Sequence, residues 1–130
     1  MKADSLQDTV ALIVEDHDAV RRALRERIQA SFGRFRLREA GTVDEALKIV
    51  ESEKVDIVLM DIRLPGMDGV DGTRRVLERS PHTSVVVVSV LDDSSHRSAA
   101  RKAGARAFVS KRAIHRELIP AIKSLVDCER

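Results

Sequence analysis

Val55-Asp-Ile-Val-Leu-Met60, followed directly by Asp61, is the stretch that decides the fold of this chain. Apart from one acid it is short, apolar and rich in β-branched residues, which is typical of a strand buried on both faces of a parallel sheet. Similar runs occur at Val10–Val14 and Val85–Val88, and Ala107-Phe108-Val109 is a weaker fourth. These runs predict the interior of a parallel sheet.

A fifth strand is predicted at Phe35-Arg36-Leu37-Arg38, where apolar and basic residues alternate as they do in a half-exposed edge strand. Between the strands, apolar residues recur at spacings of three and four, which predicts helices. Strand and helix alternate five times, so we expect an α/β fold with helices on both faces. The class is the flavodoxin-like doubly wound sheet, with five parallel strands in the order 2-1-3-4-5 and five helices.

The composition excludes several classes of function. The 130 residues suit one domain, and the net charge of +2, with three Phe and no Trp or Tyr, gives no basis for binding nucleic acid. No apolar run approaches the ~18–20 residues of a membrane span, and the polar start lacks the core of a signal peptide. The single Cys128 fits a reducing compartment, so we expect a cytoplasmic protein that binds no membrane.

Polar residues stand where the predicted strands end, and ligands bind parallel sheets at these ends. They are the pair Glu15-Asp16, then Asp61, Ser89 and the pair Ser110-Lys111. Any one of them has an ordinary explanation as a turn or cap residue. Together they come from four strands that must be neighbours, which favours a shared site.

Three carboxylates in one site repel each other, and a hard divalent cation relieves that repulsion. Mg²⁺ prefers oxygen ligands, whereas zinc and copper favour His and Cys. We read His17 as a solvent-facing residue at a helix start. Beside a metal, Asp61 is a nucleophile toward phosphorus, and the Lys111 ammonium and Ser89 hydroxyl can each take a phosphoryl oxygen.

From about Thr9 to Leu125 the chain resembles the receiver domains of two-component response regulators. The resemblance rests on four segments, of which the second is the most specific: Leu12-Ile-Val-Glu-Asp16, Val58-Leu-Met-Asp-Ile-Arg-Leu-Pro-Gly-Met-Asp-Gly69, Ser89, and Gly104-Ala-Arg-Ala-Phe-Val-Ser-Lys111. It implies a polar tail at 1–8, a receiver domain at 9–127 and a second tail at 128–130.

The resemblance also implies roles for individual residues. Asp61 would accept a phosphoryl group from a sensor histidine kinase, and Lys111 would pair with it. Ser89 would be the switch hydroxyl and Phe108 the aromatic residue that reorients with it. The ligands of Mg²⁺ would be Glu15, Asp16, Asp61 and the backbone carbonyl of Arg63. Such a protein is not an enzyme in the ordinary sense, because it catalyses only its own phosphoryl transfer and slow autodephosphorylation.

Other details resemble the receivers of LuxR-type transcription factors, in which a DNA-binding domain follows. The candidate partners are therefore a sensor kinase, a second copy of the chain and, in a longer parent protein, a C-terminal DNA-binding output domain. The sequence does not decide between a stand-alone receiver and part of a longer regulator.

Two positions depart from the commonest receiver pattern, and two others carry bulky side chains near the proposed phosphoryl group. Glu15 replaces the usual first Asp, so its metal contact is either direct or through water, and Arg112 stands where many receivers have Pro. Arg63 and Leu91 lie two residues past the phosphoacceptor and the switch hydroxyl, and we expect their bulk to shield the acyl phosphate from water.

Three other functions are compatible with parts of the sequence, but each conflicts with particular residues. A degenerate receiver that binds partners without phosphorylation conflicts with the intact acidic, Ser and Lys set. A small Mg²⁺-dependent phosphatase of similar fold typically carries a second Asp where this chain has Arg63. A nucleotide-binding flavodoxin-like module needs a Gly-rich phosphate loop, and none follows the first strand.

Overall fold

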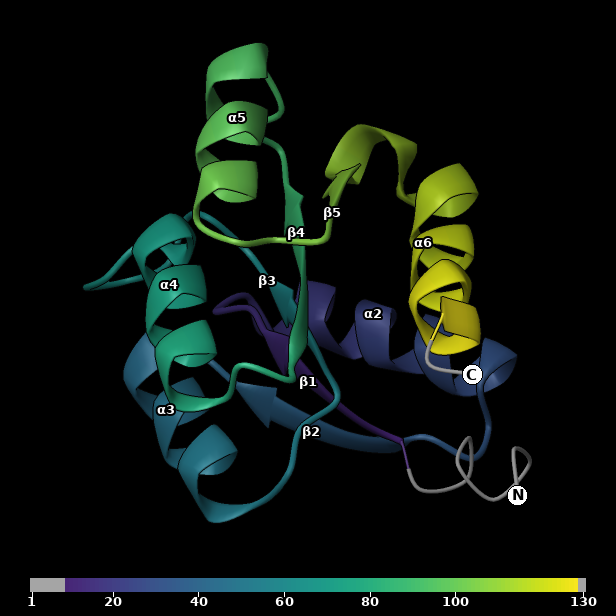
Figure 1. Ribbon diagram of the computed structural model, residues 1–130. Helices are drawn as coiled ribbons and strands as arrows, with labels where there is room; N and C mark the ends of the chain where they lie inside the picture. The colour runs from purple at the N-terminus through teal and green to yellow at the C-terminus, as the bar shows by residue number, and fades with distance from the viewer. Residues whose placement is uncertain (1–8, 129–130) are drawn as a thin grey trace.

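Strands and helices alternate along the chain in the computed structural model, which describes residues 9–128 (Figure 1). The predicted tail 1–8 lies outside the described residues, as do 129 and 130, whereas Cys128 is the last residue of a helix. The elements are β1 (Val10–Val14), α2 (Asp18–Ser31), β2 (Arg36–Ala40), α3 (Val43–Ser52), β3 (Ile57–Met60), α4 (Gly69–Arg79), β4 (Ser84–Ser89), α5 (Ser94–Lys102), β5 (Ala107–Ser110), the 3₁₀ turn η1 (Lys111–Ala113) and α6 (Ile114–Cys128).

The five strands form one parallel sheet in the order β2-β1-β3-β4-β5. This confirms the predicted order and class. From β1 the chain adds β2 on one side and β3 on the other, so the strand order reverses between β1 and β3 and their carboxyl ends flank the crevice where such sheets bind ligands.

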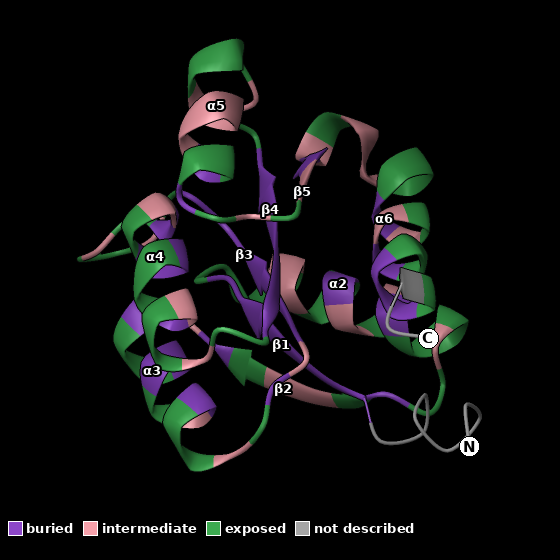
Figure 2. Cartoon of the chain, in the orientation of Figure 1, coloured by how far each residue is buried: buried purple, intermediate pink, exposed green. Residues whose placement is uncertain are grey.

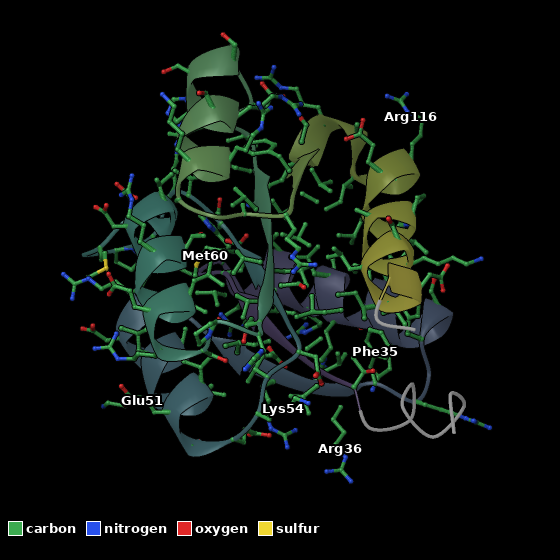
Figure 3. The ribbon with its side chains drawn as sticks, viewed as in Figure 1. Phe35, Arg36, Glu51, Lys54, Met60 and Arg116 are labelled. Carbon is green, nitrogen blue, oxygen red and sulfur yellow. The ribbon has the colours of Figure 1, made fainter. Side chains whose placement is uncertain are left out.

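Helices cover both faces of the sheet (Figure 1). Successive strand residues belong alternately to the two core layers. Leu12 and Met60 face α3, α4 and α5, whereas Ile13 and Leu59 face α2 and α6. Figure 3 shows Met60 between the sheet and α4. The central strands are buried throughout and the helices expose their outer faces (Figure 2), which explains the continuous apolar runs of the sequence.

The edge strand lies close to its predicted place. Among the described strands, β2 pairs only with β1. It begins at Arg36, one residue later than predicted, and extends to Ala40. Phe35 is buried and stacks on Phe32, with ring centroids 4.6 Å apart, so it belongs to the connection before the strand. Within the described residues, no helix has the length and apolar content needed to cross a membrane.

Candidate functional site

The carboxyl ends of four parallel strands bring the predicted residues to one edge of the sheet. The backbone ladder extends past the strands and fixes the two central acids. The Glu15 amide donates to the Ala40 carbonyl at 3.0 Å, and the Asp61 amide donates to the Val14 carbonyl at 3.1 Å. Because main-chain hydrogen bonds hold both residues, their side chains start from fixed positions on neighbouring strands.

The Lys111 side chain joins the two acids. Its Nζ lies 2.7 Å from Glu15 Oε1 and 3.2 Å from Asp61 Oδ2. The exposed fractions of the three side chains are 18% for Lys111, 1% for Glu15 and 7% for Asp61. Two largely desolvated carboxylates therefore share one ammonium, and when all three groups are ionised they carry a net negative charge that a further cation would balance.

Burial sets the ionisation of Asp61. Desolvation raises the pKa of Asp61 above its usual range, and the nearby Glu15 carboxylate adds to this. The attraction and hydrogen bond of Lys111 act in the opposite direction without cancelling the rise. For Lys111, burial lowers the pKa, but the hydrogen bond to Glu15 and the charges of both acids outweigh it, so its pKa lies above the usual value. The lysine is thus held as a cation.

The acidic pair supplies oxygen ligands beside this cluster. Glu15, Asp16 and His17 each offer a ligand atom, all within 4.8 Å of one another. The exposed Asp16 lies at the rim, whereas Glu15 is buried. His17 is the N-cap of α2 and its side chain is 74% exposed, so the prediction of a solvent-facing helix-start residue is confirmed, although Nδ1 lies 3.4 Å from Asp16 Oδ1.

The loop after Asp61 folds tightly back over its start. The Gly69 amide donates to the Ile62 carbonyl at 2.8 Å, and a Cβ at Gly69 would clash with the Asp61 carbonyl oxygen. Gly66 has φ of +80°, a conformation that L residues rarely adopt. This turn chemistry holds Arg63 in an exposed position two residues past Asp61.

The two predicted serines behave differently. Ser89 is completely buried at the end of β4, and its Oγ accepts from the Leu91 amide at 3.1 Å. Ser110 caps η1 by accepting from the Arg112 amide, and its hydroxyl donates to Asp92 Oδ2 at 2.5 Å. The convergence of polar strand ends that the sequence predicts therefore holds for Glu15, Asp61 and Lys111. The Ser110 hydroxyl instead bonds to the β4–α5 loop.

Phe108 on β5 is half-buried and packs against the cluster beneath α3, α4 and α5. The guanidinium of Arg97 on α5 covers its ring at 4.7 Å from the centroid. Sequence reasoning did not identify Arg97 or Asp92 as neighbours of the site. No local spacing signals a contact between a helix residue and a strand residue eleven positions later.

We expect Asp61→Asn to raise the free energy of unfolding at neutral pH in metal-free buffer. A pKa that is raised in the folded state gives stability that is present below the unfolded pKa and lost as the pH rises through the folded pKa, by about 1.4 kcal/mol for each unit of separation. Urea unfolding of both proteins between acidic and neutral pH measures this. Their stability difference should grow as the pH rises above the ordinary Asp range, and parallel pH profiles would contradict the assignment.

Known proteins resemble this chain in both sequence and fold. Residues 11–123 match the family model described as the response regulator receiver domain. The response regulator GacA of Pseudomonas aeruginosa is 32% identical over 119 residues, which cover 92% of this chain and 56% of that protein. The chain spans about half the length of the curated relatives that it matches.

Two solved structures extend the likeness to three dimensions. A LuxR-family two-component response regulator from Aurantimonas sp. SI85-9A1 is 28% identical with a TM-score of 0.86, covering 92% of this chain and 86% of that one. The response regulator TrrA of Thermotoga maritima, solved in complex with Mg²⁺-BeF, is 26% identical with a TM-score of 0.80. The match covers 90% of this chain and 98% of that one.

Three observations indicate the same family. They are the sheet order, the acids at the ends of neighbouring strands and the match over residues 11–123. Receiver domains are signalling modules of two-component systems rather than ordinary enzymes, and one relative, from Bacillus subtilis, is described as a transcriptional regulatory protein. The chain belongs to the response regulator receiver domain family.

Proposed function

We propose that this chain is a phosphorylation-activated switch that accepts a phosphoryl group on Asp61 from a sensor histidine kinase. The observation that carries the proposal is the Lys111 ammonium held between two buried carboxylates, 3.2 Å from Asp61 and 2.7 Å from Glu15. A structural ion pair needs only one acid. A second buried acid provides negative charge for a metal, and the ammonium is already placed to meet a phosphoryl oxygen on Asp61.

The transfer is a substitution at phosphorus. A carboxylate oxygen of Asp61 forms the new O–P bond while the P–N bond of the kinase phosphohistidine breaks, and the electron pair of that bond stays on the imidazole, which becomes protonated. Lys111 then pairs with one phosphoryl oxygen. Ser89, whose hydroxyl oxygen accepts from the Leu91 amide in this structure, keeps its own proton to donate to another oxygen.

Mg²⁺ fits the donor set because carboxylate and carbonyl oxygens are its preferred ligands. Glu15, Asp16, Asp61 and the Arg63 carbonyl would hold it, with Glu15 binding directly or through water. Bound there, the ion would neutralise charge on the phosphoryl oxygens. The exposed His17 imidazole suits other metals better, so we do not count it as a ligand.

Phosphorylation would change the surface that partners recognise. With a dianion on Asp61, Ser89 and Lys111 would be drawn inward, and Phe108 would fill the space left beside Ser89. That movement would bias the surface formed by α5, β5 and α6 between two states. GacA and a Bacillus subtilis relative described as a transcriptional regulatory protein are about twice as long as this chain, so we propose a cytoplasmic regulator in which this surface controls a DNA-binding output domain or a second copy of the chain.

Intact mass measurement tests the function. The protein is incubated with Mg²⁺ and either acetyl phosphate or phosphoramidate, alongside Asp61→Asn and an EDTA control. We expect one phosphoryl adduct that depends on Mg²⁺ and is absent in the variant. If folded protein binds Mg²⁺ but takes no phosphoryl group from these donors or from a kinase, the alternative of a phosphorylation-independent interaction module would replace the proposal.

The lifetime of the acyl phosphate should depend on two bulky neighbours. Arg63 is exposed two residues past Asp61, and Leu91 is half-buried two residues past Ser89. If they shield the phosphoryl group from water, the Arg63→Ala, Leu91→Ala double variant should lose it several times faster than the wild type. The decay of the adduct after removal of the donor measures this, and a slower decay in the double variant would refute the shielding.

A further inference from the structure

Arg97 connects three segments around the proposed switch. It lies on α5, and its Nε donates to the Asp92 carbonyl at 2.8 Å in the loop that follows β4. The same guanidinium covers the Phe108 ring on β5 at 4.7 Å from the centroid. One side chain therefore links the helix, the loop and the strand. Its planar group is suited both to donating hydrogen bonds and to stacking on a ring.

The loop end of this connection is itself fixed. Asp92 Oδ2 accepts from the Ser110 hydroxyl at 2.5 Å, and Oδ1 lies 3.7 Å from Arg112 Nη1. The Ser110 hydrogen bond lowers the pKa of Asp92, as do the charges of Arg112 and Arg97, so its carboxylate stays ionised and paired at neutral pH. The loop that begins at Ser89 is thus tied to the end of β5, and Arg97 binds to a carbonyl that does not move freely.

The contact restrains Phe108 in its present position. The ring is half-buried, with its inner side against the core cluster and the Arg97 guanidinium over one face. A ring that turns inward, toward space vacated by Ser89, would leave the guanidinium. Ser89 ends β4, three residues before Asp92, and its Oγ accepts from the Leu91 amide in the loop that follows. Arg97 therefore restrains both the loop after β4 and the Phe108 ring.

We propose that Arg97 is a positioning residue that holds Phe108 and the Ser89 loop in the resting arrangement, and so sets how readily the switch responds to phosphorylation. The inference rests on the function proposed above. It adds a restraint that must be released when Asp61 carries a phosphoryl group. If a ligand binds only the active arrangement, its apparent affinity is reduced by the fraction of molecules in the resting one.

Removing the restraint should make the switch easier to activate. A stacked cation on an aromatic ring is a modest interaction, so Arg97→Ala should tighten apparent binding of the phosphoryl analogue BeF₃⁻ by about three- to tenfold. Arg97→Lys, which keeps the charge but not the planar fork, should fall between Arg97→Ala and the wild type. The rate of phosphorylation by acetyl phosphate should rise in the same order.

Arg101→Ala is the matched control. Arg101 lies one turn further along α5 and lines the same cavity of about 350 Å³ beside Phe108, but it is exposed. BeF₃⁻ is titrated in the presence of Mg²⁺, and binding is followed by the NMR signals of ring-labelled Phe. The chain has three Phe. Phe32 and Phe35 stack on each other just before β2, at the amino ends of the strands, whereas the site lies at the carboxyl ends. These two residues therefore serve as internal references.

The expected result is a lower BeF₃⁻ midpoint in Arg97→Ala, with Phe108 responding and Phe32 and Phe35 silent, while Arg101→Ala matches the wild type. A purely structural role would lower thermal stability without tightening BeF₃⁻ binding. An unchanged or higher midpoint in Arg97→Ala would therefore overturn the inference. If wild-type protein showed no BeF₃⁻ response and no phosphorylation, the proposed function itself would fail, which is a separate outcome.

Discussion

Lys111→Met should lower the free energy of unfolding by about 3–5 kcal/mol in metal-free buffer, because removing one member of a buried ion pair leaves uncompensated charge. Methionine keeps most of the aliphatic stem and removes the ammonium that lies within 3.2 Å of both Glu15 and Asp61. Two largely buried carboxylates would then face each other without a cation. The loss should exceed that of most surface substitutions.

Mg²⁺ should restore part of that loss, because the ion can supply the missing positive charge. Urea unfolding with EDTA and with Mg²⁺ measures both effects. Lys54→Met is the matched control. The Lys54 side chain is 81% exposed and its Nζ lies 3.9 Å from Asp56 Oδ1, and such a surface ion pair contributes little to stability. Equal losses in the two variants would show that Lys111 does not balance the acids. The Lys111 variant should also fail to change its partner surface when phosphorylated.

Asp16→Asn should remove most of the response to Mg²⁺ while leaving the fold intact. Asp16 is exposed beside Glu15, so its substitution costs little stability in the absence of metal. Each factor of ten lost in Mg²⁺ affinity removes about 1.4 kcal/mol of the stabilisation that saturating metal provides. We expect phosphorylation by acetyl phosphate at fixed low Mg²⁺ to slow by about tenfold or more.

Asp18→Asn is the control for this experiment. Asp18 is also acidic and exposed, but it pairs with Arg21 at 2.7 Å on the first turn of α2. Thermal unfolding with increasing Mg²⁺ should show a rise in Tm for the wild type and Asp18→Asn, and a much smaller rise for Asp16→Asn. Three identical titrations would contradict the proposed ligand set.

The fold could be predicted because its signals are local. Buried parallel strands require continuous apolar runs, and Val10–Val14 and Val85–Val88 are such runs. The edge strand was the least well bounded, since Phe35 is apolar and buried yet stacks on Phe32 before β2 begins. Stacking between residues of one turn competes with strand pairing, and the alternating pattern cannot tell the two apart.

The core of the candidate site could also be predicted, because parallel strands must end at the same edge. That geometry alone brings Glu15, Asp61 and Lys111 together. The direction of the Ser110 hydroxyl could not be predicted. It depends on η1, where Ser110 caps the turn and reaches Asp92. The contact between the Arg97 guanidinium and the Phe108 ring likewise depends on how α5 packs over β5.

The most direct test of the central claim is to locate the phosphoryl group within the chain. Borohydride reduces an acyl phosphate to an alcohol, so an aspartyl phosphate is converted to homoserine at the residue that carried it. After treatment with acetyl phosphate and Mg²⁺, peptide mass spectrometry should find homoserine at position 61 and at no other acid. Homoserine at Asp16 or Asp92, or at no position in protein that carries the intact-mass adduct, would contradict the account.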